Sequence, residues 1–563
     1  MLVPVYTGDQ IRAAEKPLLD SGHGPALMRR AAYGLAQQIA GVLKGAVYGA
    51  QITGLIGSGN NGGDGLYALA FLARRGAAAR AVLVRQNVHH EALEAFRAAG
   101  GQAADAVPAG TQVLIDAVLG TGFRGEFSTP EIPGLAGALN THHDAAAPPP
   151  VVVACDLPSG VNADTGAAGQ GVIRADHTVT FGGLKQGLLA GRGGLLSGQL
   201  HSVDIGLGEH LPRTPVHWAA GPAQPTGPTA ADHKYSRGVV HVVAGSQAYP
   251  GAAQLTAGAV LSTGAGMVTL QAPVSVREQV IAVHPEVVGV SGPASSGAVS
   301  RASCVVVGPG IGEDPERLEE AEGVLERALE TGTACVLDAS GLGLIRGQLR
   351  RGGGLNKNVL ITPHLGEARQ LAAVMRDRLL SSMLESASPK ADPVEVARRM
   401  AGRLDCTVLL KGASTVIASP QGEVVLHRAQ APGLATAGTG DVLSGILGAL
   451  AASSAGPAGG ETPLGPRRGP RSREAPPRVL PDMAPSDTDA SVRVPDVRSP
   501  DAAAPLGSGA AAPALAPEAD WLQVAALGVG MHTAAAKHID PDGRGRFGAS
   551  QLITALHTAG DPA

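Results

Sequence analysis

From residue 51 onward, short apolar runs alternate with longer stretches of mixed polar and apolar residues. The first six runs are QITGLIG, RAVLVRQ, QVLIDAV, VVVACD, HTVTFG and LHSVDIG, and the segments between them leave room for helices. Runs that are apolar throughout are typical of strands buried on both faces. Because strands that alternate with helices form βαβ units, the pattern predicts an α/β domain in which helices cover both faces of a parallel sheet.

The alternation stops at a proline-rich junction and then begins again. The junction reads LPRTPVHWAAGPAQPTGP, and this density of proline and glycine is typical of a linker. The later apolar runs are GVVHVVAG, GMVTLQAP, ASCVVVGPG, ACVLDAS, NVLITPH and CTVLLKG. We therefore expect a first domain over residues 1–215, a linker over 216–228 and a second α/β domain over 229–563.

Residues 453–519 differ in composition from the rest of the chain. These 67 residues contain 13 of the 41 prolines, and they contain no aromatic residue and no lysine. Such a segment buries too little apolar surface to offset its chain entropy. It separates the apolar stretches DVLSGILGALAA and LQVAALGVGMHTAAAKHI. We therefore predict a disordered insertion within the second domain.

The composition indicates a globular protein whose partners are small molecules. Hydrophobic residues make up 44% of the 563 residues and charged residues 16%, which supplies enough apolar material for two large cores. A formal net charge of −4 gives no basic surface for nucleic acid. No apolar run reaches the ~18 residues of a membrane span, and the N-terminus does not resemble a secretory signal. We expect a cytoplasmic protein that binds neither nucleic acid nor membrane.

The four cysteines lie far apart in the sequence and have no CxxC spacing. Each one lies in or beside a short apolar run, and they are Cys155, Cys304, Cys335 and Cys406. This placement predicts small core residues in a reducing compartment rather than metal ligands or redox pairs.

The first motif that carries chemistry is LIGSGNNGGDG, between an apolar run and the helical stretch LYALAFLARRG. Its glycines, Gly57, Gly59, Gly62 and Gly63, allow a ligand to approach the backbone at a helix N-terminus. Asn60, Asn61 and Asp64 add oxygen atoms that a phosphate-binding loop does not need. They suit a hard cation or the polar face of a nucleotide, although a turn with helix-capping residues gives the same pattern.

Two further apolar runs of the first domain end in carboxylates beside glycine-rich turns. Asp116 precedes GTGFRGE, and Asp156 precedes LPSG, which contains Ser159. A single aspartate after a strand is usually a turn residue or a helix cap. Because the carboxyl ends of parallel strands line one crevice, three such ends in one domain predict a ligand site.

The second domain has four motifs of its own, GPGIG, ITPHLGE, LLKGAST and AGTGDVLSG. In the last, Gly438 and Gly440 free the backbone at a helix start, where N–H groups face a developing phosphate charge. Asp441 follows at a position from which a base reaches a substrate hydroxyl. A capped helix start gives the same local pattern, and the Walker A motif GxxxxGK[ST] is absent from the sequence.

In order and spacing, GSGNNGGDG, DAVLGTGFRGE and DLPSG resemble the NAD(P)H-hydrate epimerase domain over about residues 1–215. The resemblance implies a Rossmann-like three-layer fold that interconverts the R and S forms of a hydrated nicotinamide cofactor. We assign proton transfer to Asp156, because epimerisation breaks and re-forms one bond at the reacting carbon. The resemblance places the hydrated cofactor on Asn60, Asn61, Gly62, Gly63, Asp64, Gly120, Thr121, Gly122, Phe123, Arg124, Gly125, Glu126 and Asp156. It places a potassium ion on Asn61, Asp116 and Ser159.

The second set of motifs resembles the ADP- or ATP-dependent NAD(P)H-hydrate dehydratase domain, a ribokinase-like α/β fold, over about 225–452 and 520–560. The resemblance implies that the hydrated cofactor contacts Ala253, Gly310, His364 and Asp441, with Asp441 as the catalytic base. It places the nucleotide, with Mg²⁺, on Lys411, Gly412, Ala413, Ser414, Thr415 and Gly440. Leu365 stands where the family has proline, and Ser340 and Gly341 also depart from its usual residues.

Together the resemblances imply a bifunctional repair enzyme that epimerises hydrated NADH and NADPH and dehydrates the S form. Either ADP or ATP fits the sequence, and we expect a homo-oligomer. A ribokinase-type small-molecule kinase fused to a nucleotide-binding module is the alternative, since the GTGD motif suits phosphoryl transfer equally well. A first domain that only binds a nucleotide or a partner, without turnover, is a third interpretation.

Overall fold

A computed structural model of the chain describes residues 2–85, 87–125, 127–139, 148–221, 223, 228–230, 232–292, 298–385, 392–454 and 520–558. The insertion predicted at 453–519 lies outside the described residues, apart from Ser453 and Ser454. These two serines end helix α15 (Thr439–Ser454).

The first sheet is parallel throughout and has seven strands in the order β4-β3-β2-β5-β6-β7-β9. The strands are β2 (Gln51–Ile56), β3 (Ala78–Leu83), β4 (Gln102–Ala104), β5 (Val113–Ala117), β6 (Val151–Cys155), β7 (His177–Phe181) and β9 (Gln199–Val203). Each of the six apolar runs contains a strand, so the predicted parallel sheet is confirmed. The chain moves outward from β2 in one direction and from β5 in the other, which places a topological switch point between them.

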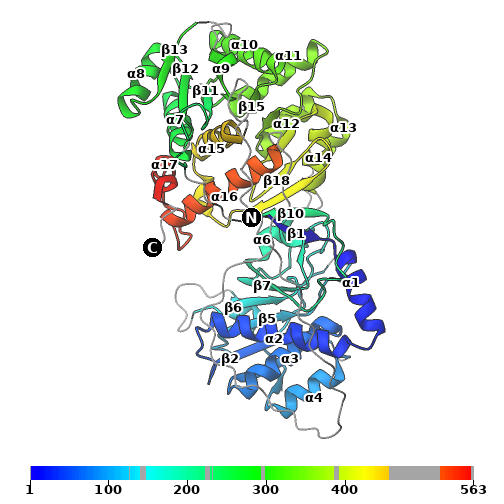
Figure 1. The fold of residues 1–563 in the computed structure, drawn as a ribbon. Coiled ribbons are helices and arrows are strands. Elements are labelled where there is room, and N and C mark those ends of the chain that lie inside the picture. The colour runs from blue at the N-terminus through cyan, green and yellow to red at the C-terminus, as the bar shows by residue number, and fades with distance from the viewer. Residues whose placement is uncertain are drawn as a thin grey trace, which may run out of the picture. The chain divides into compact units, whose positions relative to one another are not determined.

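Both faces of this sheet are covered (Figure 1). The helices are α1 (Gly8–Asp20), α2 (Gly24–Val42), α3 (Asn60–Arg74), α4 (His90–Ala98), α5 (Leu135–Leu139), α6 (Gly191–Leu196) and the 3-10 turn η1 (Gln186–Leu188). Ile56 of β2 belongs to the same core as Leu35 of α2, whereas the adjacent Leu55 packs on the other side with Leu135 of α5. Because successive side chains of a strand point to opposite faces, one strand supplies both cores.

The second sheet has twelve strands in the order β13-β12-β11-β14-β15-β16-β17-β18-β19-β10-β1-β8. It is parallel from β13 to β17, and β18 pairs antiparallel with both of its neighbours. The strands are β1 (Leu2–Tyr6), β8 (Leu184–Lys185), β10 (His217–Ala220), β11 (Val239–Val243), β12 (Met267–Gln271), β13 (Val288–Val290), β14 (Cys304–Val307), β15 (Ala334–Leu337), β16 (Val359–Ile361), β17 (Thr407–Leu410), β18 (Ser414–Ala418) and β19 (Val424–Arg428).

Part of the segment expected to be a linker is a strand. Residues His217–Ala220 form β10, which pairs antiparallel with β1 and parallel with β19. His217 and Ala219 are buried, whereas Trp218 and Ala220 are half-buried. This alternation within HWAA suits a strand, and the flanking prolines concealed it in the sequence.

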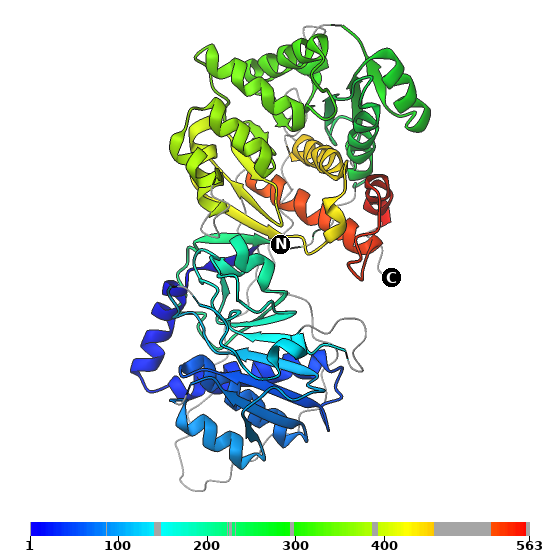
Figure 2. The same ribbon diagram turned by 180° about the vertical axis from the view of Figure 1, so that it is seen from behind.

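Helices lie on both faces of the second sheet (Figures 1 and 2). They are α7 (Pro250–Thr263), α8 (Val274–Val283), α9 (Ala298–Arg301), α10 (Pro315–Thr331), α11 (Ile345–Arg350), α12 (Leu365–Val374), α13 (Arg378–Glu385), α14 (Pro393–Leu404), α15, α16 (Trp521–Ile539), α17 (Ala549–Thr558) and the 3-10 turns η2 (Ala339–Leu344) and η3 (Pro432–Ala435). Val305 of β14 packs in one core with Leu325 of α10, and the next residue, Val306, packs in another with Leu447 of α15. The predicted second α/β fold is therefore confirmed.

Candidate active sites

A cavity of about 680 Å³ opens at the carboxyl edge of the first sheet, beside the switch point between β2 and β5. Its walls come from α1, α2, the turn between β2 and α3, the loop after β5 and the residues after β6 and β7. The volume lies within the ~300–1,000 Å³ that is usual for small-molecule sites.

Glycine is required where the turn after β2 crosses the loop after β5. A Cβ atom on Gly57 would lie 2.0 Å from the carbonyl oxygen of Val118, and one on Gly62 would lie 2.1 Å from that of Gly57. No side chain fits at either position, because both neighbours are backbone atoms. The close approach brings the first residues of α3 to the wall of the cavity.

Most of the residues predicted to hold the hydrated cofactor line this cavity. They are Asn60, Asn61, Asp64, Gly120, Thr121, Gly122, Phe123, Arg124 and Asp156. Gly62 and Gly63 are buried in the first turn of α3, next to the lining residues but not among them. Gly125 follows the lining segment with φ +113°, and Glu126 lies outside the described residues.

Asp156 lies against a buried lysine that the sequence analysis did not predict. The Nζ atom of Lys185 donates to Oδ1 of Asp156 at 2.6 Å, and also to the Thr180 hydroxyl and the Phe181 carbonyl. The lysine side chain is 1% exposed and that of Asp156 is 10% exposed. Asp156 has φ +67°, a left-handed conformation that is rare outside glycine, so the turn after β6 holds this carboxylate in a strained position.

Two more carboxyl groups line the cavity near Asp156. Burial raises the pKa of Asp64 well above its usual range, and the charges of Asp156 and Glu15 add to the rise. Burial also raises the pKa of Glu15, which the nearby Lys185 partly opposes. The cavity therefore holds three carboxyl groups and one buried cation, an arrangement that favours a shared proton at Asp64 or Glu15.

The three residues predicted to bind potassium meet around the backbone of Leu119. Asp116 accepts from the Ser159 hydroxyl at 2.5 Å and from the Ser159 amide at 2.8 Å. Asn61 donates its amide to the Leu119 carbonyl at 3.0 Å, and the Leu119 amide donates to the Ser159 hydroxyl at 2.9 Å. Burial raises the pKa of Asp116. Within the described residues, no lysine or arginine pairs with Asp116, so a monovalent cation fits beside this carboxylate and these oxygens.

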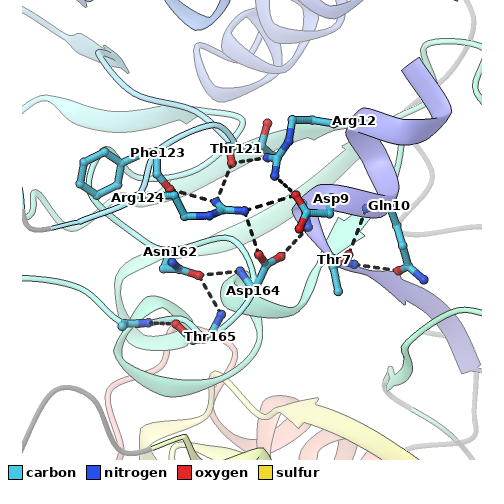
Figure 3. Close-up of polar contacts among 12 residues, drawn as sticks. Thr7, Asp9, Gln10, Arg12, Thr121, Phe123, Arg124, Asn162, Asp164 and Thr165 are labelled. Carbon is cyan, nitrogen blue, oxygen red and sulfur yellow. Dashed lines mark hydrogen bonds and ion pairs between the residues drawn. The ribbon is translucent and has the colours of Figure 1, made fainter. Parts of the chain in front are cut away.

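Two arginines hold the loop after β5 against α1 (Figure 3). Arg12 donates to the Thr121 carbonyl at 2.6 Å, and Arg124 donates to the same carbonyl at 3.2 Å. Arg124 also pairs with Asp164 at 3.1 Å and with Asp9 at 3.5 Å. Exposed ion pairs contribute little individually. Here they converge on one carbonyl of the cavity wall, and the network fixes that wall.

In the second domain, the strand ends gather a second lysine–carboxylate pair. Lys411, after β17, donates to Oδ1 of Asp338, after β15, at 2.6 Å. Thr362 and Ser444 also donate to Asp338, at 2.7 and 2.8 Å. Burial alone would raise the pKa of Asp338, but the charge of Lys411 and these hydrogen bonds lower it. Asp338 therefore stays ionised.

Asp441 has the opposite electrostatic environment in the same place. Burial and the neighbouring charge of Asp338 raise its pKa to about 6, against the smaller opposing effect of Lys411. A Cβ built on Gly440 would lie 3.6 Å from Nζ of Lys411 and 3.9 Å from Oδ2 of Asp338. The start of α15 therefore faces this charged pair. A carboxylate that titrates near neutrality is suited to accept a proton at physiological pH.

The predicted nucleotide residues lie in the turn between β17 and β18 and at the start of β18. They are Lys411, Gly412, Ala413, Ser414 and Thr415, and Gly440 lies beside Lys411. In the part of the chain that the structure describes, the Ser414 hydroxyl is buried without a hydrogen-bond partner.

The residues predicted to contact the hydrated cofactor in the second domain occupy different kinds of position. His364 caps α12: its Nδ1 accepts from the amides of Gly366 and Glu367, and the Glu367 carboxylate accepts from the His364 amide. Leu365, at the expected proline position, is the first residue of α12, where either residue is compatible with a helix start.

Gly310 and Ala253 lie at the turn after β14 and within α7. Gly310 has φ +65° and faces Tyr249 and Ala252. Ala253 is fully buried and packs below Gly245, so its side chain does not line an open surface. Of the four predicted substrate residues, Asp441 and His364 lie beside the Asp338–Lys411 pair: the charges of both partners act on Asp441, and His364 forms a β-bridge with Lys411.

Two family models match the chain. The model described as YjeF-related protein N-terminus matches residues 24–187, and the one described as NAD(P)H-hydrate dehydratase matches residues 240–461. The bifunctional NAD(P)H-hydrate repair enzyme Nnr of Mycobacterium tuberculosis is 41% identical over 461 residues, covering 80% of this chain and 89% of that protein. The chain belongs to the bifunctional NAD(P)H-hydrate repair enzyme family.

Another member of this repair enzyme family, from Escherichia coli, is 33% identical over 418 residues, covering 70% of this chain and 76% of that protein. A solved structure of the ADP/ATP-dependent NAD(P)H-hydrate dehydratase from Bacillus subtilis, co-crystallised with ATP/Mg²⁺, covers 60% of this chain and 93% of its own. Its sequence identity is 18% and its TM-score is 0.40.

Lys185 and Asp338 were missed because neither lies in one of the motifs to which a role was assigned. A lysine inside the apolar stretch TVTFGGLKQGLL was the one available signal for Lys185, since a lone lysine is rarely buried without a partner. Asp338 ends an apolar run just as Asp116 and Asp156 do, and that was its signal.

The cysteines behave as predicted, since all four are buried and free. Among the described residues there is no group of three histidine, cysteine or acidic side chains placed to hold a metal ion. No helix in the described ranges is long and apolar enough to cross a membrane.

Proposed function

We propose that residues 1–215 epimerise the R and S forms of hydrated NADH and NADPH, and that residues 229–563 dehydrate the S form at the expense of ADP or ATP. The observation that carries the proposal is that one chain holds both sets of family motifs, each gathered where parallel strands of its own sheet end. We also infer, from the resemblance alone, a homo-oligomer in the cytoplasm.

In the epimerase half, Asp156 moves the proton. The hydrated ring enters the cavity beside Asp156, and the C–O or C–N bond at its hydroxyl-bearing carbon breaks and re-forms on the other face. Lys185 holds Asp156 through Oδ1, which leaves Oδ2, the oxygen without the lysine, for the substrate. Asn60, Asn61, Asp64 and the segment from Gly120 bind the rest of the cofactor.

Asn61, Asp116 and Ser159 would hold the potassium ion. The ion would supply a positive charge beside the buried Asp116 carboxylate. These residues then fix the backbone of Leu119 and the cavity wall that follows it. Among the described residues Asp116 is hydrogen-bonded by Ser159 but forms no ion pair with a cationic side chain, which supports this assignment.

In the dehydratase half, Asp441 accepts the proton of the substrate hydroxyl while that oxygen attacks the terminal phosphate of the nucleotide. The N–H groups at the start of α15 and the Lys411 ammonium stabilise the charge that develops on the phosphate. The phosphorylated oxygen then leaves as phosphate, pushed by the ring nitrogen, and the adjacent ring carbon loses a proton. Dihydronicotinamide is regenerated.

Mg²⁺ would bind with the nucleotide and neutralise its phosphate charge. The site offers the carboxylates of Asp338 and Asp441, and the described residues hold no cluster of three metal ligands. This donor set fits a cation that keeps water and takes its other ligands from phosphate.

The proposal is tested by mixing the purified full-length chain with acid-hydrated NADH, which contains both epimers, and with ADP or ATP. We expect the dihydronicotinamide absorbance to return completely and only when a nucleotide is present. If only the absorbance expected from one epimer returned, the first domain would be a binding module. Nucleotide turnover with a small hydroxylated substrate, without any return of absorbance, would favour the kinase alternative.

A further inference from the structure

The second domain has a hollow of about 590 Å³ that none of the assigned residues touches. It lies where α11, α12 and α14 end, and four of its lining residues are Arg346, Arg350, Arg376 and Arg403. We call it the arginine-lined hollow. Helix α12 starts at the capping residue His364 and has ten residues, so this hollow lies about 15 Å from the start of the helix.

One of these arginines occupies a backbone position that favours glycine. Arg376 has φ +53° and directly follows the C-cap of α12. Its amide donates to the Ala373 carbonyl, and the next amide, of Asp377, donates to the Ala372 carbonyl. This is the Schellman ending of a helix, in which glycine is usual because a side chain in the left-handed region costs stability. An arginine at this position, despite that cost, indicates that its side chain has a function.

The positive charge of the hollow is only partly neutralised. The buried Asp377 carboxylate pairs with Arg399 at 2.9 Å and more loosely with Arg403 at 3.6 Å. Among the described residues, Arg346, Arg350 and Arg376 form no ion pair.

The three helix ends carry negative partial charges of their own. Each helix carboxyl end is equivalent to roughly −0.5 elementary charge, or about −1.5 for three ends. Four guanidinium groups exceed this, so positive potential remains in the hollow.

We propose that the arginine-lined hollow binds a multiply charged phosphate anion, such as a polyphosphate or the phosphate chain of a nucleotide. Guanidinium groups bind phosphate oxygens through paired N–H groups, and their charge does not titrate in the physiological range. Arg346 and Arg350 are one helical turn apart on α11 and present their groups on one side. Arg376 follows the end of α12 and Arg403 lies in α14, so an anion with several phosphates can contact groups from three directions.

This site is separate from the nucleotide residues of the proposed function. Those residues follow the carboxyl end of β17, whereas the hollow lies at the carboxyl end of α12, which runs back from that edge of the sheet. The proposal therefore does not depend on which reaction the domain catalyses.

The test measures binding of tripolyphosphate to the full-length chain by titration calorimetry. Two binding events are expected in the wild type, one at the hollow and one at the nucleotide residues. Arg376→Gly and Arg346→Ala/Arg350→Ala should each weaken one event about tenfold or more, and Lys411→Met should weaken the other. Arg301→Ala, at an exposed arginine of α9 outside the hollow, is the matched control and should change neither event.

Arg376→Gly separates binding from folding. Because glycine suits φ +53°, this variant should raise the thermal midpoint while it loses binding, so the loss cannot come from unfolding. The proposal is overturned if Arg376→Gly and Arg346→Ala/Arg350→Ala leave every binding event within twofold of wild type. The arginines would then serve only the helix ends. Inorganic phosphate should bind at least about tenfold more weakly than tripolyphosphate. Equal affinity for the two anions would overturn the proposal that the ligand is a multiply charged phosphate.

Discussion

Lys185 Nζ lies 2.6 Å from Asp156 Oδ1, and the two side chains are 1% and 10% exposed. The aspartate directly follows β6 of the first sheet, and the lysine is the last residue of β8, which pairs with β1 in the second sheet. The pair gives the cavity a carboxylate whose charge is balanced by the buried lysine ammonium at Oδ1. Its second oxygen, Oδ2, does not contact the lysine.

Removing one partner of this pair should destabilise the chain more than removing both. Lys185→Met leaves the Asp156 charge buried and unpaired, and we expect a loss of about 3–5 kcal/mol in the free energy of unfolding. Lys185→Met/Asp156→Asn should recover part of that loss. Denaturant unfolding of the wild type, both single variants and the double variant measures the coupling. Additive losses would show that the pair contributes nothing as a pair.

Asp156→Asn should separate the two proposed activities in the full-length chain. The amide keeps the shape of the carboxylate but accepts no proton, so epimerisation should fall about 10²–10⁴-fold. With a mixture of epimers and a nucleotide, absorbance should return at the wild-type initial rate and then stall when the S form is consumed. Chromatography of the hydrated cofactor that remains should show the R form alone. An unchanged rate of epimer exchange would mean that Asp156 only binds.

Asp441→Asn should abolish dehydration, spare epimerisation and change the pH dependence of stability. The folded-state pKa of about 6 lies above the ordinary 3.8, so protonated Asp441 favours the folded state and this contribution is lost as pH rises through 6. Relative to wild type, the variant should be more stable at pH 8 by roughly 1–3 kcal/mol, with the difference vanishing toward pH 4.

Thermal melts of both proteins across this pH range give the measurement. Wild-type dehydration should also slow below pH 6, because protonated Asp441 accepts no proton. A constant difference in stability at all pH values would contradict the raised pKa.

The glycines of the turn after β2 should differ sharply in their tolerance of alanine. Gly57→Ala forces a Cβ atom against the Val118 carbonyl oxygen at 2.0 Å, and we expect a loss of about 2–4 kcal/mol together with epimerase activity. Gly59→Ala is the matched control, because nothing lies within 4 Å of its Cβ position and its φ is −95°. Its stability should stay within about 0.5 kcal/mol of wild type. Equal losses of stability in the two variants would show that the close contact with Val118 is not what requires glycine at position 57.

The sequence alone determined the parallel first sheet, the parallel strands of the second sheet and the loops that line the first cavity. Apolar runs such as VVVACD form strands because a strand buried on both faces has no polar side to present, and glycine-rich turns follow where backbones cross. The positions of Asn61, Asp116 and Ser159 around one backbone segment followed from the rule that parallel strands end at one edge.

Only the tertiary structure decided which charges meet. Asp156 with Lys185 and Asp338 with Lys411 are 29 and 73 residues apart, and each pair forms because the fold brings two strand ends together. The raised pKa of Asp441 depends on burial and on Asp338, neither of which is encoded near position 441. Local pattern fixes where a strand starts and ends, whereas electrostatic environment depends on distances across the sheet, and these exist only once the chain has folded.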